Sequence, residues 1–204
     1  MPKENAVLMH DAWYSLTGRW KNAVIATLVF VAISFLAGVV PWAGWIAGIV
    51  IGGPMALGYV RFIVGYDRRD PAATVETVFS GFDSFLNAFV AQLLMFLFIF
   101  LWSLLLIVPG IMAAYSYQMT FFVMNDHPGI SGQDAITRSK DLMRGHRWRL
   151  FCLDLRYIGW WILCILTCGV LILWICPYWY TARAKFYQDL TTPGEHPSPI
   201  AEGR

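Results

Sequence analysis

The stretch SGQDAITRSKDLMRGHRWRLFCLDLRYIGW, residues 131–160, decides the class of this protein. Ser131 followed by Asp134 has the form of a helix N-terminus, where a side-chain oxygen accepts hydrogen bonds from free backbone N–H groups. The helix that follows is predicted to have an apolar face of Ala135, Ile136, Ser139, Leu142 and Met143 and a polar face of Asp134, Thr137, Arg138, Asp141 and Arg144. It is too short and too charged to cross a bilayer. Gly145 is expected to end or bend it, as glycine does at helix ends.

Five basic residues stand just before the apolar run that begins after Arg149: Arg138, Lys140, Arg144, Arg147 and Arg149. One interpretation is a site for anionic lipid headgroups or for an acidic partner. The other is ordinary membrane topology, because basic residues stay on the cytoplasmic side of a membrane protein. The pattern alone is compatible with both, and topology is the commoner cause.

The composition favours an integral membrane protein. Of 204 residues, 58% are hydrophobic and 14% are charged, whereas a soluble protein has roughly half apolar and about a quarter charged residues. The net charge is only +2, so no bulk affinity for nucleic acid is implied. Three runs carry no charge at all, residues 22–60, 84–125 and 157–182. Each is long enough for two membrane passes of roughly 20 residues when flanking residues are included.

Turn-forming residues lie near the middle of each uncharged run, at Pro41, at Pro109-Gly110 and at Cys168-Gly169. The expected fold is therefore all-α, a polytopic membrane protein of about six transmembrane helices in three hairpins. Each hairpin is expected to follow a cytoplasmic amphipathic helix. Lysines and arginines are absent from the three turns, so the positive-inside rule predicts that the N- and C-termini are cytoplasmic.

The glycines that precede the hairpins, Gly18, Gly81 and Gly145, are nearly equally spaced. This spacing suggests a threefold internal repeat with units of about residues 5–66, 70–126 and 131–190. Residues 1–190 would then form a single helical membrane domain. Residues 191–204 are rich in proline and are expected to be a disordered tail.

Polar residues within the apolar runs form a candidate intramembrane polar site of Arg61, Gln92, Gln118, Asp154 and Arg156. Asp154 and Arg156 are two positions apart, so they do not face each other on a helix. Because an unpaired charge in a membrane is costly, Asp154 needs another partner, for which Arg61 is one candidate. Gln92 and Gln118 are expected to hydrogen-bond between helices or, alternatively, to line a substrate path.

Small residues recur every fourth position in the second half of the first uncharged run, at Gly44, Gly48, Gly52 and Ala56. Such a groove lets another helix approach closely. It is expected to serve packing within the monomer or, alternatively, an interface between subunits.

Residues with catalytic or metal-binding potential are scattered. The four histidines fall outside the apolar runs, and the four cysteines lie in apolar sequence without a nearby histidine. No phosphate-binding loop, dinucleotide-binding fingerprint, zinc-protease motif or nucleophile elbow is present. We therefore expect no catalytic residue, no metal and no cofactor.

From about Phe79 to Leu190 the chain resembles the bacterial integral membrane proteins grouped as domain of unknown function 975. The motifs that carry this resemblance are Pro109-Gly110-Ile111, Ala114 to Met119, Ser139, Leu142-Met143, Gly145-His146, Trp148 to Phe151, Leu153 to Leu155, Ile158 to Trp160, Leu166-Thr167, Gly169, Trp174, Pro177-Tyr178 and Phe186-Tyr187. The resemblance implies a multi-pass protein of the bacterial cytoplasmic (inner) membrane and implies no activity. Arg156 replaces an expected small polar residue, so no role is transferred to it.

The expected function is that of a non-enzymatic accessory or interaction protein that binds lipid or a partner at the cytoplasmic face. Membrane lipids and a further copy of the chain or another membrane protein are the expected partners, and nucleic acid is not. Two alternatives stay open. One is a small transporter or efflux component with a path along Gln92, Gln118, Asp154 and Arg156. The other is a membrane enzyme acting on a lipid headgroup, with Asp154 as its acid.

Overall fold

The computed structural model describes residues 4–39, 43–167 and 169–191, and helices account for almost all of them. The elements in chain order are α1 (Asn5–Leu16), α2 (Trp20–Val39), α3 (Ala43–Asp67), the 3₁₀ helix η1 (Val75–Ser84), α4 (Phe85–Leu105), α5 (Ile107–Tyr117), α6 (Thr120–Asp126), α7 (Gly132–Leu142), α8 (Arg147–Arg156), α9 (Ile158–Leu166) and α10 (Ile172–Thr191). These residues contain no strand, so the prediction of an all-helical protein is confirmed.

Three stretches are helical, long and apolar enough to cross a membrane: Gly48–Asp67, Val75–Leu104 and Ile107–Asp126. A fourth results if α1 and the first part of α2, which meet at 99°, are taken as one span. The expected six passes are thus matched only in part. In the last uncharged run the helix breaks at Tyr157 and again after Leu166, which leaves α9 with 9 residues. The expected turn residues Pro41 and Cys168 and the tail from residue 192 lie outside the described residues.

The break between α4 and α5 falls at Leu106, whose φ of −162° and ψ of 143° are extended. The sequence predicted this turn at Pro109-Gly110, three residues later. Pro109 instead lies in the first turn of α5, where the amide proton that proline lacks has no helical partner in any case.

The three glycines of the predicted repeat do not behave alike. Gly18 and Gly145 have φ of +81° and +79° and interrupt the chain before α2 and α8, as predicted for helix ends. Gly81 lies inside η1, where the helix crosses α3 so closely that a methyl group at Gly81 would collide with the carbonyl of Pro54. The threefold repeat therefore stays a prediction.

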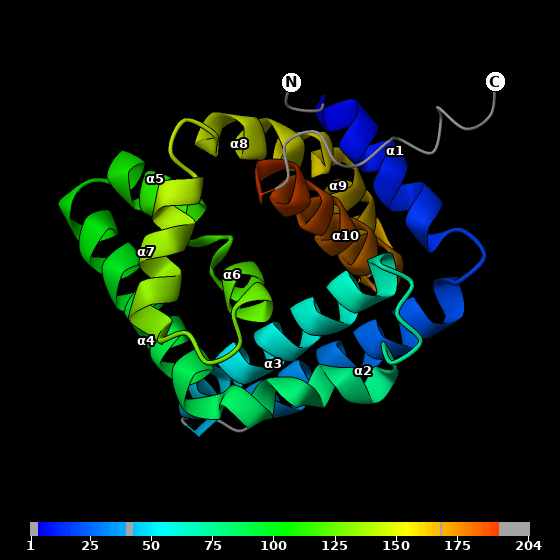
Figure 1. Ribbon diagram of the computed structural model, residues 1–204, viewed down its shortest axis with the longest axis horizontal. Helices are drawn as coiled ribbons and strands as arrows, with labels where there is room; N and C mark the ends of the chain where they lie inside the picture. The colour runs from blue at the N-terminus through cyan, green and yellow to red at the C-terminus, as the bar shows by residue number, and fades with distance from the viewer. Residues whose placement is uncertain (1–3, 40–42, 168, 192–204) are drawn as a thin grey trace.

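The helix α7 begins as the sequence predicted, because the Ser131 hydroxyl accepts a hydrogen bond from the Asp134 amide at 3.2 Å. Its predicted apolar face is also the buried one, with Ala135, Ile136 and Ser139 covered. The helix runs alongside α4 and α5 (Figure 1), and the Ser139 hydroxyl donates to the carbonyl of Ser116 at 2.8 Å. The apolar face of α7 is therefore covered by protein.

The last helix, α10, lies against α1, α2 and α3 (Figure 1) and carries three ion pairs to other elements. Arg183 pairs with Asp154 of α8 at 2.7 Å, Lys185 with Asp67 of α3 at 2.8 Å, and Asp189 with Arg149 of α8 at 2.7 Å. Each of the six side chains is at most 17% exposed. These pairs fix the position of α10 against α3 and α8.

Candidate functional site

The five basic residues before the last apolar run do not form one patch. Arg149 forms an ion pair with Asp189, and its guanidinium lies 4.9 Å from the centre of the Phe186 ring. Arg144 is exposed and pairs with the exposed Asp141 at 3.4 Å. This leaves Arg138, Lys140 and Arg147 without an ion pair to any residue that the structure describes.

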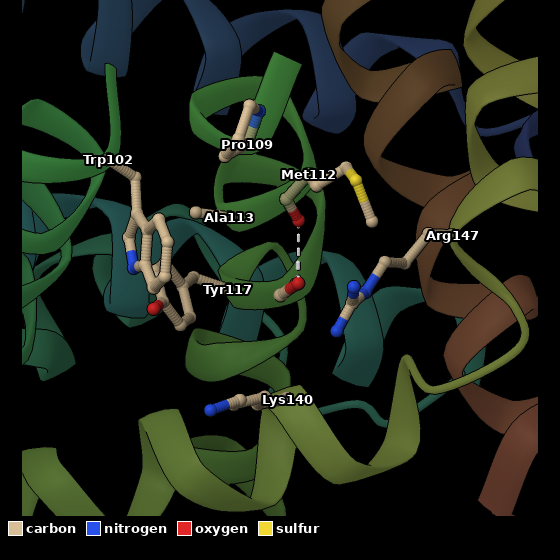
Figure 2. A pocket seen from close by; sticks show the side chains of 8 residues that line it. Trp102, Pro109, Met112, Ala113, Tyr117, Lys140 and Arg147 are labelled. Carbon is tan, nitrogen blue, oxygen red and sulfur yellow. Dashed lines mark hydrogen bonds between the residues drawn. The ribbon is translucent and has the colours of Figure 1, made fainter. Parts of the chain in front are cut away.

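Lys140 and Arg147 line one pocket, which we call the basic pocket (Figure 2). Its volume is about 180 Å³, and its wall consists of Trp102, Pro109, Met112, Ala113, Ser116, Tyr117, Lys140 and Arg147. The aromatic rings of Trp102 and Tyr117 stand on one side, and the guanidinium of Arg147 reaches in from the other. The two cations come from α7 and from the start of α8, on either side of the bend at Gly145.

The basic pocket has an unbalanced positive charge because no acidic side chain lines it. The Nε of Arg147 is buried and has no hydrogen-bond partner in the described residues. The Ser116 hydroxyl is already used, because it donates to the Met112 carbonyl at 2.6 Å, the bond drawn in Figure 2. An anion in this pocket would therefore meet two cations and an unused N–H donor.

The surface beside the basic pocket is apolar. Trp102 and Met112 are half exposed, and the turn between α4 and α5 exposes large side chains at Leu104, Leu106, Ile107 and Val108. Exposed apolar surface of this extent marks a contact with membrane or with another protein. Cations next to such a surface match a molecule that has an anionic head and an apolar tail.

Arg138 lies in a different hollow, of about 460 Å³, together with His127, Asp141 and Tyr187. The carboxylate of Asp141 offsets the positive charge there. Burial raises the pKa of Tyr187, and the carboxylate of Asp126 raises it further, so this phenol, which is neutral at pH 7 in any case, adds no charge to the hollow. This hollow therefore lacks the charge imbalance of the basic pocket.

The candidate intramembrane polar site is only partly assembled. Asp154 accepts hydrogen bonds from Arg183 at 2.7 Å and from the indole of Trp179 at 2.9 Å, so the prediction of Arg61 as its partner is wrong. Arg61 instead binds η1, through the carbonyl of Ser80 at 2.5 Å and the hydroxyl of Ser84 at 3.2 Å. Arg156 is exposed at the end of α8.

Gln92 and Gln118 do come together, in a cavity of about 390 Å³ between α3, α4, α5, α6 and α10. We call it the interior cavity, although it is partly open at the surface beside the half-exposed Phe96. Arg183 lines it as well, and the remaining wall is apolar or aromatic, including Val60, Phe96 and Phe121. Neither glutamine makes a side-chain hydrogen bond within the described residues, so the expected bonds between helices are absent.

The small-residue groove is also placed differently from the prediction. A methyl group added at Gly48 or Gly52 would touch no described atom, Ala56 lines the interior cavity, and the surroundings of Gly44 are outside the description. Close packing occurs instead at Gly53 and Gly58, where an added methyl group would collide with the backbone of α4 and η1. The stripe predicted from the sequence is thus offset from the face of α3 that packs.

Sequence reasoning missed Arg183, Lys185 and Asp189 as functional or structural partners. The available signal was that three charges follow an apolar run within one helix, where each needs a counter-charge.

The described residues contain no group of three histidine, cysteine or acidic side chains that could hold a metal ion.

These features define an all-helical protein with at least three helices of membrane-spanning length, a basic pocket beside exposed apolar surface and an interior cavity between helices. The family model described as "Protein of unknown function (DUF975)" matches residues 1–116 and 103–193. The chain belongs to this family, as its motifs from Pro109 onwards predicted. The match also takes in the first hairpin, which lies before the residues that carry the motifs. No curated protein and no solved structure matches the chain.

Proposed function

We propose that this protein is a non-enzymatic membrane protein that binds anionic lipid headgroups in the basic pocket and acts as an accessory or interaction protein at the membrane surface. The observation that carries the proposal is that Lys140 and Arg147 line a pocket with no acidic side chain, next to the exposed apolar turn between α4 and α5. A phosphate group would pair with both cations, while acyl chains would cover the apolar surface.

The position of α7 supports a site at headgroup depth. Its outer face carries Asp134, Arg138 and Asp141, all exposed, and the helix runs beside α4. Charged groups are costly in the hydrocarbon core but not among headgroups. We therefore expect the part of α4 beside α7 to lie at a depth where the charged face of α7 contacts water or lipid headgroups.

The test is native mass spectrometry of the protein in mild detergent, titrated with phosphatidylglycerol or phosphatidylcholine of the same chain length. The variant Lys140→Gln/Arg147→Gln is expected to bind phosphatidylglycerol at least tenfold more weakly, because a hydrogen bond to a charged group contributes about 1.5–3 kcal/mol. The control Arg144→Gln removes an exposed arginine that already has a partner and should change binding less than twofold. Equal binding of phosphatidylglycerol by the double variant and the wild type would contradict the proposal.

A second candidate is a small transporter or efflux component, which the interior cavity favours. That function requires a cavity with polar groups between the helices, and Gln92, Gln118 and Arg183 lie in one. The enzyme alternative has less support, because Asp154, its proposed acid, is held by Arg183 and Trp179 and does not line the basic pocket. Cells or proteoliposomes that accumulate a labelled substrate only with intact Gln92 and Gln118 would favour transport over lipid binding.

A further inference from the structure

The interior cavity contains polar groups whose hydrogen-bonding capacity no described residue uses. Gln92 lies on α4 and Gln118 follows α5, and each amide has two donors and an acceptor free of described partners. Arg183 is only 7% exposed, and its buried Nε has no hydrogen-bond partner. Buried polar groups nearly always have partners, so the buried Nε of Arg183 indicates that something else supplies one. The half-buried amides of Gln92 and Gln118 line the same cavity and are free to bind the same molecule.

We propose that the interior cavity binds an uncharged, mainly apolar small molecule that carries an amide, ester or hydroxyl group. Its volume of about 390 Å³ falls in the usual range of small-molecule pockets, which are mostly apolar with a few polar groups that orient the ligand. The apolar wall, formed in part by Val60, Phe96, Ile99, Phe121 and Phe122, matches a hydrocarbon or ring body. This inference does not depend on lipid binding in the basic pocket.

The charge of the site selects an uncharged ligand. Arg183 brings a positive charge to the cavity, but the carboxylate of Asp154 lies 2.7 Å from its guanidinium and neutralises it. An anion would therefore give up its hydration without gaining an unpaired cation. Amide side chains both donate and accept, so Gln92 and Gln118 suit a polar group that does the same.

The experiment uses the full chain in phosphatidylcholine nanodiscs and a decanamide probe with a diazirine in its alkyl chain. After irradiation, labelled peptides are mapped by mass spectrometry, and labelling is competed with unlabelled decanamide, decanoate or decane at concentrations corrected for partition into the bilayer. We expect labelling of the cavity-lining parts of α4, α6 and α10. Decanamide should displace half of it at a concentration at least tenfold lower than decanoate or decane.

The double variant Gln92→Leu/Gln118→Leu should weaken competition by decanamide tenfold or more, at roughly three- to tenfold for each lost hydrogen bond. The matched control Gln133→Leu changes an exposed glutamine on α7 and should have no effect. Labelling confined to lipid-exposed residues, or equal competition by all three compounds, would overturn the proposal and indicate a cavity filled by water alone. The comparison of the three competitors needs only the wild type, so it decides the question even if the variants do not fold.

Discussion

Arg183 and Asp154 form an ion pair at 2.7 Å between helices α10 and α8, 29 positions apart in the chain. The guanidinium also lies 3.5 Å from the centre of the Trp179 ring, and the indole of Trp179 donates to the same carboxylate. The three side chains thus form one closed unit at the wall of the interior cavity. A buried charge pair of this kind fixes the register of the two helices, because any shift would leave a charge unpaired.

Asp154→Asn should destabilise the protein by about 3–5 kcal/mol, because it leaves the charge of Arg183 buried without its counter-charge. The control Asp141→Asn removes one partner of an exposed pair and should cost less than about 1 kcal/mol. Unfolding in detergent by a chemical denaturant measures both. Replacement of both partners, Asp154→Asn/Arg183→Gln, should recover part of the loss, and a D154N protein as stable as D141N would contradict the central role of this pair.

Gly58→Ala should destabilise the fold by about 1–3 kcal/mol, because the added methyl group would collide with the backbone of Val78 and Gly81 in η1. Gly159→Ala is the matched control, since this glycine lies in α9 and an added methyl group would touch nothing within 4 Å. The control should be neutral or slightly stabilising because alanine favours a helix over glycine by about 1 kcal/mol. Thermal unfolding compares the two variants, and equal melting temperatures would refute the close crossing of α3 and η1.

Ser131→Ala should cost about 1 kcal/mol through loss of the N-terminal cap of α7. Thr137→Ala serves as the control, because its hydroxyl bonds only to the Gln133 carbonyl inside the same helix. Because loss of the cap lets the start of α7 open more often, amide hydrogen exchange in residues 132–142 should rise in S131A and not in T137A. Unchanged exchange in S131A would mean that packing against α4 alone holds the start of this helix.

The local features of the chain were predictable because their causes are local. The cap at Ser131, the bends at Gly18 and Gly145 and the buried face of α7 each depend on residues within about one or two helical turns. The family assignment was predictable for a similar reason, since it depends on short motifs in a fixed order.

The partners of charged residues were not predictable, because several arginines could reach Asp154 and only the packing of α10 selects Arg183. The number of six passes stays a prediction, because counting uncharged residues detects apolarity but not the helix breaks at Tyr157 and after Leu166. The amphipathic pattern of α7 likewise gave its buried face but not what covers it, which is α4 and α5. Gln92 and Gln118, 26 positions apart, share a cavity only because α4 and α5 pack together.

The most direct measurement of the central claim is the location of bound lipid. A phosphatidylglycerol analogue with a photoreactive diazirine near its headgroup is incorporated into nanodiscs with the protein, and the labelled residues are mapped by mass spectrometry. The proposed function predicts labelling between residues 102–117 and between residues 140–147, which is lost in K140Q/R147Q and retained in R144Q. Equal labelling by the matching phosphatidylcholine analogue, or labelling that is unchanged in K140Q/R147Q, would contradict the account.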